Sequence, residues 1–135
     1  MSPAPRLAAV ISTGELERLY SGLSVLVSTA AEGTPCAGLA AFRSLELLLD
    51  GELMHRALEP DATPSLSWAG RETFASSLLE LRETALGLDT LRLYACAASV
   101  DAMGVSAADV EERLAGTMST PRFLRESGEA RLLFI

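Results

Sequence analysis

Short apolar runs alternate along the chain with longer segments whose apolar residues recur every three or four positions. The short runs are typical of buried strands, and the wider spacing is typical of amphipathic helices. The pattern predicts strands at residues 7–11, 36–42, 91–95 and 131–134. It predicts a helix from about residue 16 to 31, and further helices at 44–49, 71–86 and 106–115. A last helix begins at Thr120 and Pro121.

Polar residues and glycines mark where several of these helices begin and end. Ser12 and Glu15 have the spacing of a capping box, in which each side chain accepts a hydrogen bond from a free backbone amide. Gly33, Gly87 and Gly128 follow the last apolar positions of three predicted helices. Glycine is favoured there because it adopts the left-handed conformation that ends a helix.

The regular alternation of strands and helices predicts the fold class. Such an order implies an α/β fold with a mainly parallel sheet of four or five strands and helices on both faces. No linker or internal repeat divides residues 1–135, so one domain is expected.

Residues 51–70, which include His55 and Trp68, are the least regular stretch. A loop of that length is either functional or poorly ordered.

Charge and composition narrow the classes of partner. The net charge is −7, and the eleven basic residues, all arginine, form no basic patch, which argues against nucleic acid and anionic membranes. No apolar run approaches the roughly 18 residues of a membrane span. The run at residues 7–11 is too short for the core of a signal peptide, so a cytoplasmic protein is expected. One histidine and two cysteines that lie far apart in sequence do not form the ligand pattern of a zinc site. No metal or other cofactor is therefore expected.

The carboxyl ends of parallel strands meet at one edge of a sheet, where α/β proteins place their chemistry. Three polar segments are expected at that edge: Ser12, Thr13 and Gly14; Arg43 with its neighbours; and residues 96–99. The segment of residues 116–120, with Thr117, reaches the same place only if the last helix leans toward it. A helix start near Ser12, Thr13 and Gly14 could hold an anion, although it is more often only a cap.

Cys96 is the one nucleophile-capable side chain that this topology places at the edge. A buried, inert cysteine is the plainer interpretation. The chemical interpretation needs a thiolate, whose pKa the free amides at Ala97 to Ser99 and the start of a helix would lower. Arg43 is the best-placed cation. Cys36 begins a strand, so we expect it at the opposite edge as an inert core thiol that forms no disulfide with Cys96.

Several stretches resemble the DsrE/DsrF/DsrH-like sulfur-relay family, particularly its small members that are labelled peroxiredoxin-like. The resemblance is carried by residues 7–16, 26–31, 91–104, 116–124 and 131–134. The strand that ends in Cys-Ala-Ala-Ser, followed by Met-Gly, is its most specific part. Residues 50–75 do not share it.

The resemblance implies a three-layer flavodoxin-like fold and a homo-oligomer, commonly a trimer or hexamer. It implies that Cys96 is the sulfur-carrying residue, which takes sulfur from a persulfide donor protein and passes it to an acceptor protein. Arg43, Ala97, Ser99 and Thr117 would then line the site with residues 12–14. Two alternatives stay open: a non-catalytic homo-oligomeric module that binds a small anion or metabolite at this edge, and, more weakly, a thiol peroxidase.

Overall fold

The structure is a computed structural model that describes residues 3–135. Its sheet has five parallel strands in the order β4-β3-β2-β1-β5. The strands are β1 (Leu7–Ile11), β2 (Cys36–Ala40), β3 (Leu91–Cys96), β4 (Thr117–Met118) and β5 (Arg131–Phe134). The helices are α1 (Leu16–Ala31), α2 (Phe42–Leu49), α3 (Leu53–Ala57), α4 (Trp68–Gly87), α5 (Ala97–Met103), α6 (Ala107–Arg113) and α7 (Thr120–Ser127).

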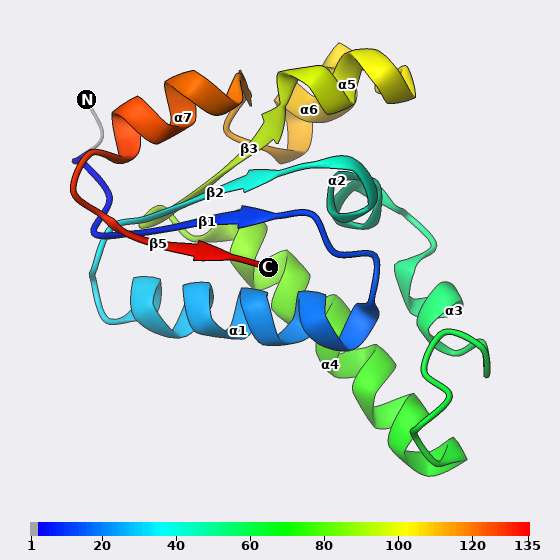
Figure 1. The fold of residues 1–135 in the computed structure, drawn as a ribbon. Coiled ribbons are helices and arrows are strands. Elements are labelled where there is room, and N and C mark those ends of the chain that lie inside the picture. Colours follow the sequence, from blue (N-terminus) through cyan, green and yellow to red (C-terminus); the bar gives the residue numbers. More distant parts are fainter. Residues whose placement is uncertain (1–2) are drawn as a thin grey trace.

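Helices cover both faces of the sheet, which gives three layers (Figure 1). The larger core lies on one face, where leucines of α1 and α4 and the Val110 side chain of α6 pack against β1, β2 and β3. On the other face, Phe123 of α7 packs with Met118, Leu39 and Cys96 in a smaller cluster. The predicted α/β, flavodoxin-like layered architecture is therefore confirmed.

The sheet differs from the prediction at the ends of two elements. Residues 36–42 were expected to form one strand, but β2 ends at Ala40 and Phe42 begins α2 with a φ of 48°. Residues 116–120 were expected to form only a turn, yet Thr117 and Met118 pair with Ala95 and Cys96 as a short edge strand. Both differences arise at the carboxyl edge, where tertiary contacts override the local pattern.

Residues 51–70 are more ordered than the sequence pattern indicated. They contain α3, on which His55 lies, and the first turn of α4, whose N-cap Ser67 accepts a hydrogen bond from the Gly70 amide. Buried Arg71 fixes the connection, because its guanidinium donates to the hydroxyl of Thr63 at 3.1 Å and to the carbonyl of Leu66 at 3.1 Å. These hydrogen bonds hold the loop against α4.

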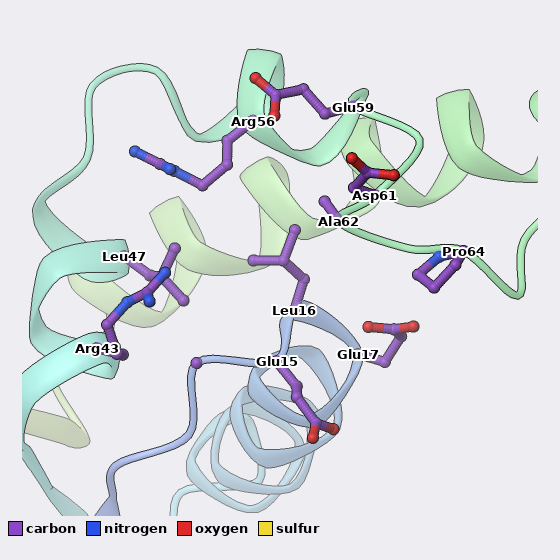
Figure 2. Close-up of a pocket in the computed structure, with 11 residues that line it drawn as sticks. Glu15, Leu16, Glu17, Arg43, Leu47, Arg56, Glu59, Asp61, Ala62 and Pro64 are labelled. Carbon is purple, nitrogen blue, oxygen red and sulfur yellow. The ribbon is translucent and has the colours of Figure 1, made fainter.

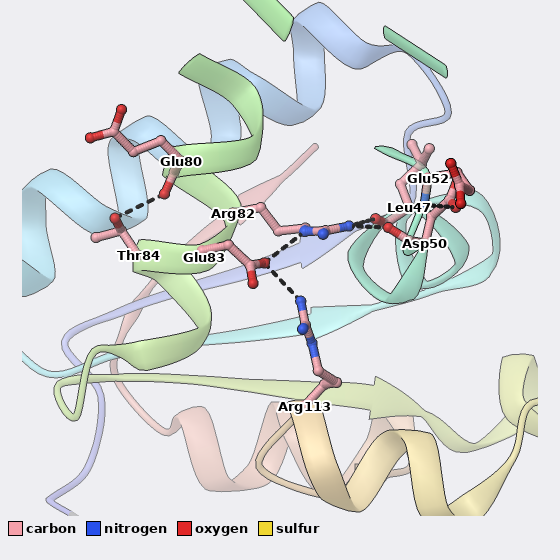
Figure 3. A network of polar contacts seen from close by, with 8 residues as sticks. All are labelled: Leu47, Asp50, Glu52, Glu80, Arg82, Glu83, Thr84 and Arg113. Atoms are coloured by element: carbon pink, nitrogen blue, oxygen red, sulfur yellow. Dashed lines mark hydrogen bonds and ion pairs between the residues drawn. The ribbon is translucent and has the colours of Figure 1, made fainter. Parts of the chain in front are cut away.

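Both arginines of α4 are buried, although charged residues of a helix usually face solvent. Arg82 is only 4% exposed. Its Nη1 donates to the carbonyl oxygens of Leu47, at 3.1 Å, and Asp50, and its Nε lies 3.0 Å from a carboxylate oxygen of Glu83 (Figure 3). The carbonyls that end α2 are thus capped by a side chain of α4.

Helix boundaries follow only some of the predicted signals. Gly33 and Gly128 have positive φ angles of 93° and 55° at helix ends, as predicted. Gly87 instead lies within α4. The Ser12–Glu15 capping box does not form, because α1 begins one residue after Glu15 and the Glu15 amide donates to the Thr13 hydroxyl.

Within residues 3–135, no helix has both the length and the apolar character needed to cross a bilayer.

Candidate functional site

Cys96 lies where the chain leaves the sheet between two strands with divergent connections. It is the last residue of β3 and the N-cap of α5, and it pairs with Met118 of β4. After β3 the chain forms α5 and then α6, which both pack with the larger core on the face of α1 and α4. After β4 it forms α7, which packs on the other face. Open α/β sheets bind ligands at the carboxyl edge where neighbouring connections diverge in this way.

Hydrogen-bond donors surround the Cys96 sulfur. Burial acts to raise the pKa of the thiol, but the backbone amide and hydroxyl of Ser99, the amide of Ala98 and the hydroxyl of Thr120 lower it, and the net pKa lies below the ordinary value. These donors stabilise the sulfur as an anion, because each bonds to the charged form. The Cys96 thiolate therefore forms more easily than that of an ordinary cysteine, although the site lies in an apolar cluster.

Ser99 is held in place by the segment that follows β2. Its side chain is fully buried, and its Oγ accepts a hydrogen bond from the Phe42 amide at 2.9 Å. The same hydroxyl is among the groups that lower the pKa of the Cys96 thiol. Phe42 keeps a positive φ to make this bond, a conformation that costs about 1–3 kcal/mol in a residue with a side chain.

The Cys96 sulfur is not open to solvent at this edge. The residue is only 5% exposed and packs among Ala41, Met118 and Phe123. The cause is the unpredicted strand β4, which covers the outer side of β3 and brings the start of α7 over the thiol. An approaching reagent must therefore displace part of this cover before it reaches the sulfur.

Cys36 has a contrasting environment at the opposite edge of the sheet. It begins β2, is buried, and its thiol lies 3.3 Å from the carbonyl oxygen of Thr34. Burial raises the pKa of this thiol. Both cysteines are free, as expected for two residues at opposite edges of the sheet. Cys36 therefore has the character of an inert core thiol.

The other candidate segments do meet at the carboxyl edge. The Ser44 hydroxyl donates to the carbonyl of Thr13 at 2.7 Å, and a Cβ added to Gly14 would lie 3.1 Å from the Cβ of Arg43. The Ser12 amide donates to the carbonyl of Ile135. The turns after β1 and β2 thus pack directly on one another.

Gly14 and Arg43 open onto a cavity of about 560 Å³ between α1, α2 and the loop that follows α3. Figure 2 shows Arg43 and Arg56 on one side of it and the carboxylates of four acidic residues around it: Glu15, Glu17, Glu59 and Asp61. The N-cap Glu15 makes no side-chain hydrogen bond to the free amides of α1. The cavity therefore combines a bare helix start with mixed charge.

Arg43 does not act as the cation for Cys96 in this arrangement. Its Nε lies 3.9 Å from a carboxylate oxygen of Glu46, and it is not among the groups that lower the thiol pKa. The Cys96 sulfur does not line the Arg43 cavity. The candidate residues thus divide between two places, the thiol site and the Arg43 cavity.

Two further candidates lie beside the thiol without supplying its donors. Ala97 begins α5, and Thr117 is an exposed residue of β4 that pairs with Ala95. The hydroxyl that contacts Cys96 belongs to Thr120, at the start of α7. Sequence reasoning assigned Thr120 only to a helix start. Its position directly before Pro121, at the carboxyl edge, was the signal that could have identified it.

Comparison with known proteins does not assign the chain to a family. No protein-family model matches it, and no curated protein matches its sequence. Among residues 3–135, no group of three or more His, Cys, Asp or Glu side chains is arranged to hold a metal ion. What the site can do must therefore be argued from its own chemistry.

Proposed function

We propose that the protein is a sulfur carrier that relays persulfide sulfur through Cys96. The observation that supports this proposal is the set of donors from Ala98, Ser99 and Thr120, which lowers the thiol pKa despite burial. A thiolate is the species that attacks sulfur, and its formation requires no metal. The resemblance of residues 91–104 to a sulfur-relay family points in the same direction.

The transfer has two balanced steps. The Cys96 thiolate attacks the terminal sulfur of a donor persulfide, R–S–SH; a new S–S bond forms, and the donor leaves as the thiolate R–S⁻. Cys96 then carries the sulfur as a persulfide with its proton. An acceptor thiolate attacks that outer sulfur, the bond to Cys96 breaks, and the Cys96 thiolate returns. No oxidant is consumed, since the sulfane sulfur only changes its partner.

Access to the sulfur is part of the proposal. The cover over Cys96 is β4, which has two residues and pairs with β3 only at Ala95 and Cys96. A short edge strand is among the segments that open at low cost. Transient opening of this strand, which also moves the Thr120 hydroxyl away, admits the donor persulfide and then the acceptor thiol. A homo-oligomeric carrier in the reducing cytoplasm fits the two free thiols.

Intact-mass measurement after loading with a small persulfide donor tests the proposal. The wild-type chain is expected to gain about 32 Da, the mass of one sulfur, and to lose it to an added thiol acceptor. Cys96→Ser should gain nothing, whereas Cys36→Ser, the matched control, should load as the wild type does. A wild-type chain that takes up no sulfur, or one that loads on Cys36, would overturn the proposal.

A second candidate function rests on the Arg43 cavity. The bare start of α1 and the Arg43 guanidinium could together hold a small anion or an anionic metabolite, with Cys96 serving only in packing. Inorganic phosphate should then raise the melting temperature of the wild type and of Cys96→Ser equally, and Arg43→Ala should abolish the rise. A phosphate effect that survives Arg43→Ala would exclude this site.

A further inference from the structure

Among residues 3–135, no helix covers one strip of the sheet. On the face that carries α7, Phe123 and Met118 cover the strands around Cys96, and Ala8 and Val10 of β1 share that face. Register pairing aligns Leu132 with Ala8 and Phe134 with Val10, so these β5 side chains lie on the same face. Leu132 is 50% exposed and Phe134 76% exposed. The uncovered strip, which we call the β5 face, comprises Val10, Leu132 and Phe134.

Helix α7, which packs on the same face of the sheet, carries another exposed apolar side chain. Phe123 points into the sheet, and Glu126 lines the flank of α7 nearest Tyr94 of β3. Leu124 lies about 100° further around the helix from Phe123, on the opposite flank, and is itself exposed. An exposed apolar strip at a sheet edge, such as the β5 face, marks an interaction site.

The outer backbone edge of β5 has no partner strand within residues 3–135. On the inner edge, the amides of Arg131 and Ile135 donate to the carbonyl of Arg6, directly before β1, and to that of Val10 on β1. Since backbone groups alternate along a strand, the N–H and C=O groups of Leu132 and Phe134 point away from the sheet. β5 is the last strand of the sheet and has no proline or lysine that would discourage pairing.

We propose that β5 pairs antiparallel with β5 of a second copy across a two-fold axis at Leu133, so that the two sheets become one. In this register Leu132 lies opposite Phe134 of the second copy. The outward N–H and C=O groups of each such pair bond to one another, as in a hydrogen-bonded antiparallel pair. The apolar side chains of Leu132 and Phe134 then cover each other across the axis.

Charge at the two ends of β5 favours the antiparallel arrangement of two copies. Arg131 begins the strand, and Glu17 of α1 lies beside its far end, where both Glu17 and Phe134 line one shallow cavity. Neither residue has an ion-pair partner in the described part of the chain. The two-fold axis brings Arg131 of each copy toward Glu17 of the other, whereas parallel self-pairing would place like ends together.

Sedimentation velocity at high micromolar concentration tests the inference. The wild type should have twice the 14.3 kDa mass of one chain. Phe134→Asp should raise the dimer dissociation constant about tenfold or more, because it buries a charge at the centre of the interface. Trp68→Asp is the matched control, since it replaces an aromatic residue of similar exposure at the start of α4, far from β5 (Figure 1), and should not change the mass.

Two further measurements define the register. The amides of Leu132 and Phe134 should be protected from hydrogen exchange in the wild type and should exchange freely in Phe134→Asp. Arg131→Glu and Glu17→Arg should each weaken the dimer, and the double variant should restore it. A monomer, a trimer, or a dimer that Phe134→Asp leaves intact would overturn the inference. Persulfide loading plays no part in any of these results, so the proposed function is tested separately.

Discussion

The backbone amide of Phe42 donates to the Oγ of Ser99 at 2.9 Å, across 57 positions of sequence. This bond ties the end of β2 to the helix that begins under Cys96. The same Ser99 hydroxyl is among the groups that lower the pKa of the Cys96 thiol. The positive φ of Phe42 is therefore linked through one hydroxyl to the charge state of the thiol.

Removal of that hydroxyl should affect both reactivity and stability. In Ser99→Ala the thiol loses one of its donors, so its pKa should rise and alkylation of Cys96 at neutral pH should slow. The Phe42 amide also loses its partner, which should cost about 1–3 kcal/mol of unfolding free energy. Timed iodoacetamide labelling and urea unfolding measure the two effects.

Ser127→Ala is the matched control for that experiment. Ser127 is also a buried helical serine, and its hydroxyl donates to the Phe123 carbonyl at 2.7 Å without contacting Cys96. It should alter stability only slightly and leave the labelling rate unchanged. Equal labelling rates in the wild type and Ser99→Ala would show that the hydroxyl does not tune the thiol.

The layered fold could be predicted because its signals are local. The apolar run of residues 7–11 and the helical spacing that follows it each specify an element without help from the rest of the chain. Gly33 and Gly128 end helices because glycine itself permits the positive φ found there. Local patterns of this kind survive folding because tertiary packing agrees with them.

The details of the site could not be predicted, because contacts distant in sequence determine them. β4 has only two residues, so its pairing with Cys96 leaves no periodic signal. Phe42 is predicted as the end of an apolar strand, but it has a positive φ and its amide bonds to Ser99, a residue distant in sequence. Arg82 reads as a surface residue of α4, and only the carbonyls at the end of α2 account for its burial.

The two thiols should titrate in opposite directions from an ordinary cysteine. The pKa of Cys96 is lowered by its hydrogen-bond donors, and the pKa of Cys36 is raised by burial. The rate of alkylation as a function of pH, followed by mass spectrometry of each cysteine-bearing peptide, should show an earlier rise for Cys96. A Cys36 profile that rises at lower pH than that of Cys96 would contradict this ordering.

The same shifts give the two thiols opposite effects on alkaline stability. A lowered pKa means that Cys96 contributes stability above its unfolded pKa, and that this contribution is lost as pH falls through the folded pKa. A raised pKa means that Cys36 contributes below its unfolded pKa and loses that contribution as pH rises. Urea midpoints measured from neutral to alkaline pH should therefore diverge between Cys96→Ser and Cys36→Ser.

Asp50 should contribute to the loss of stability in acid. Its burial acts to raise the pKa, but the Glu52 amide and the Arg56 side chain, whose Nε lies 2.7 Å from its carboxylate, lower it below the ordinary value. Its contribution is thus present above the unfolded pKa and is lost as pH falls through the folded pKa.

Asp50→Asn should reduce the loss of unfolding free energy between neutral and acidic pH. The reduction should be about 1 kcal/mol or less, because Arg56 is partly exposed and solvent screens the pair. Chemical unfolding between neutral and acidic pH measures the slope. Glu46→Gln serves as the control, since Glu46 forms a looser and more exposed pair with Arg43. Equal slopes in the wild type and Asp50→Asn would show that the pair does not influence acid stability.

Replacement of Arg82 should destabilise the protein. In Arg82→Met the carbonyls of Leu47 and Asp50 lose a charged donor and keep only the longer bonds from the backbone amides of Asp50 and Leu53, while an apolar stem still fills the space. A hydrogen bond from a charged group contributes about 1.5–3 kcal/mol. Urea unfolding should show a loss in that range or somewhat above it, with α2 the first region to gain hydrogen exchange.

Arg113→Met separates this capping role from the ion pair that shares Glu83. Arg113 lies 2.7 Å from the same Glu83 carboxylate as Arg82, but it is far more exposed and contacts neither carbonyl of α2 (Figure 3). Its replacement should cost about 1 kcal/mol or less. If Arg113→Met destabilises the protein as much as Arg82→Met, the Glu83 ion pair rather than the capped carbonyls anchors α4 to α2.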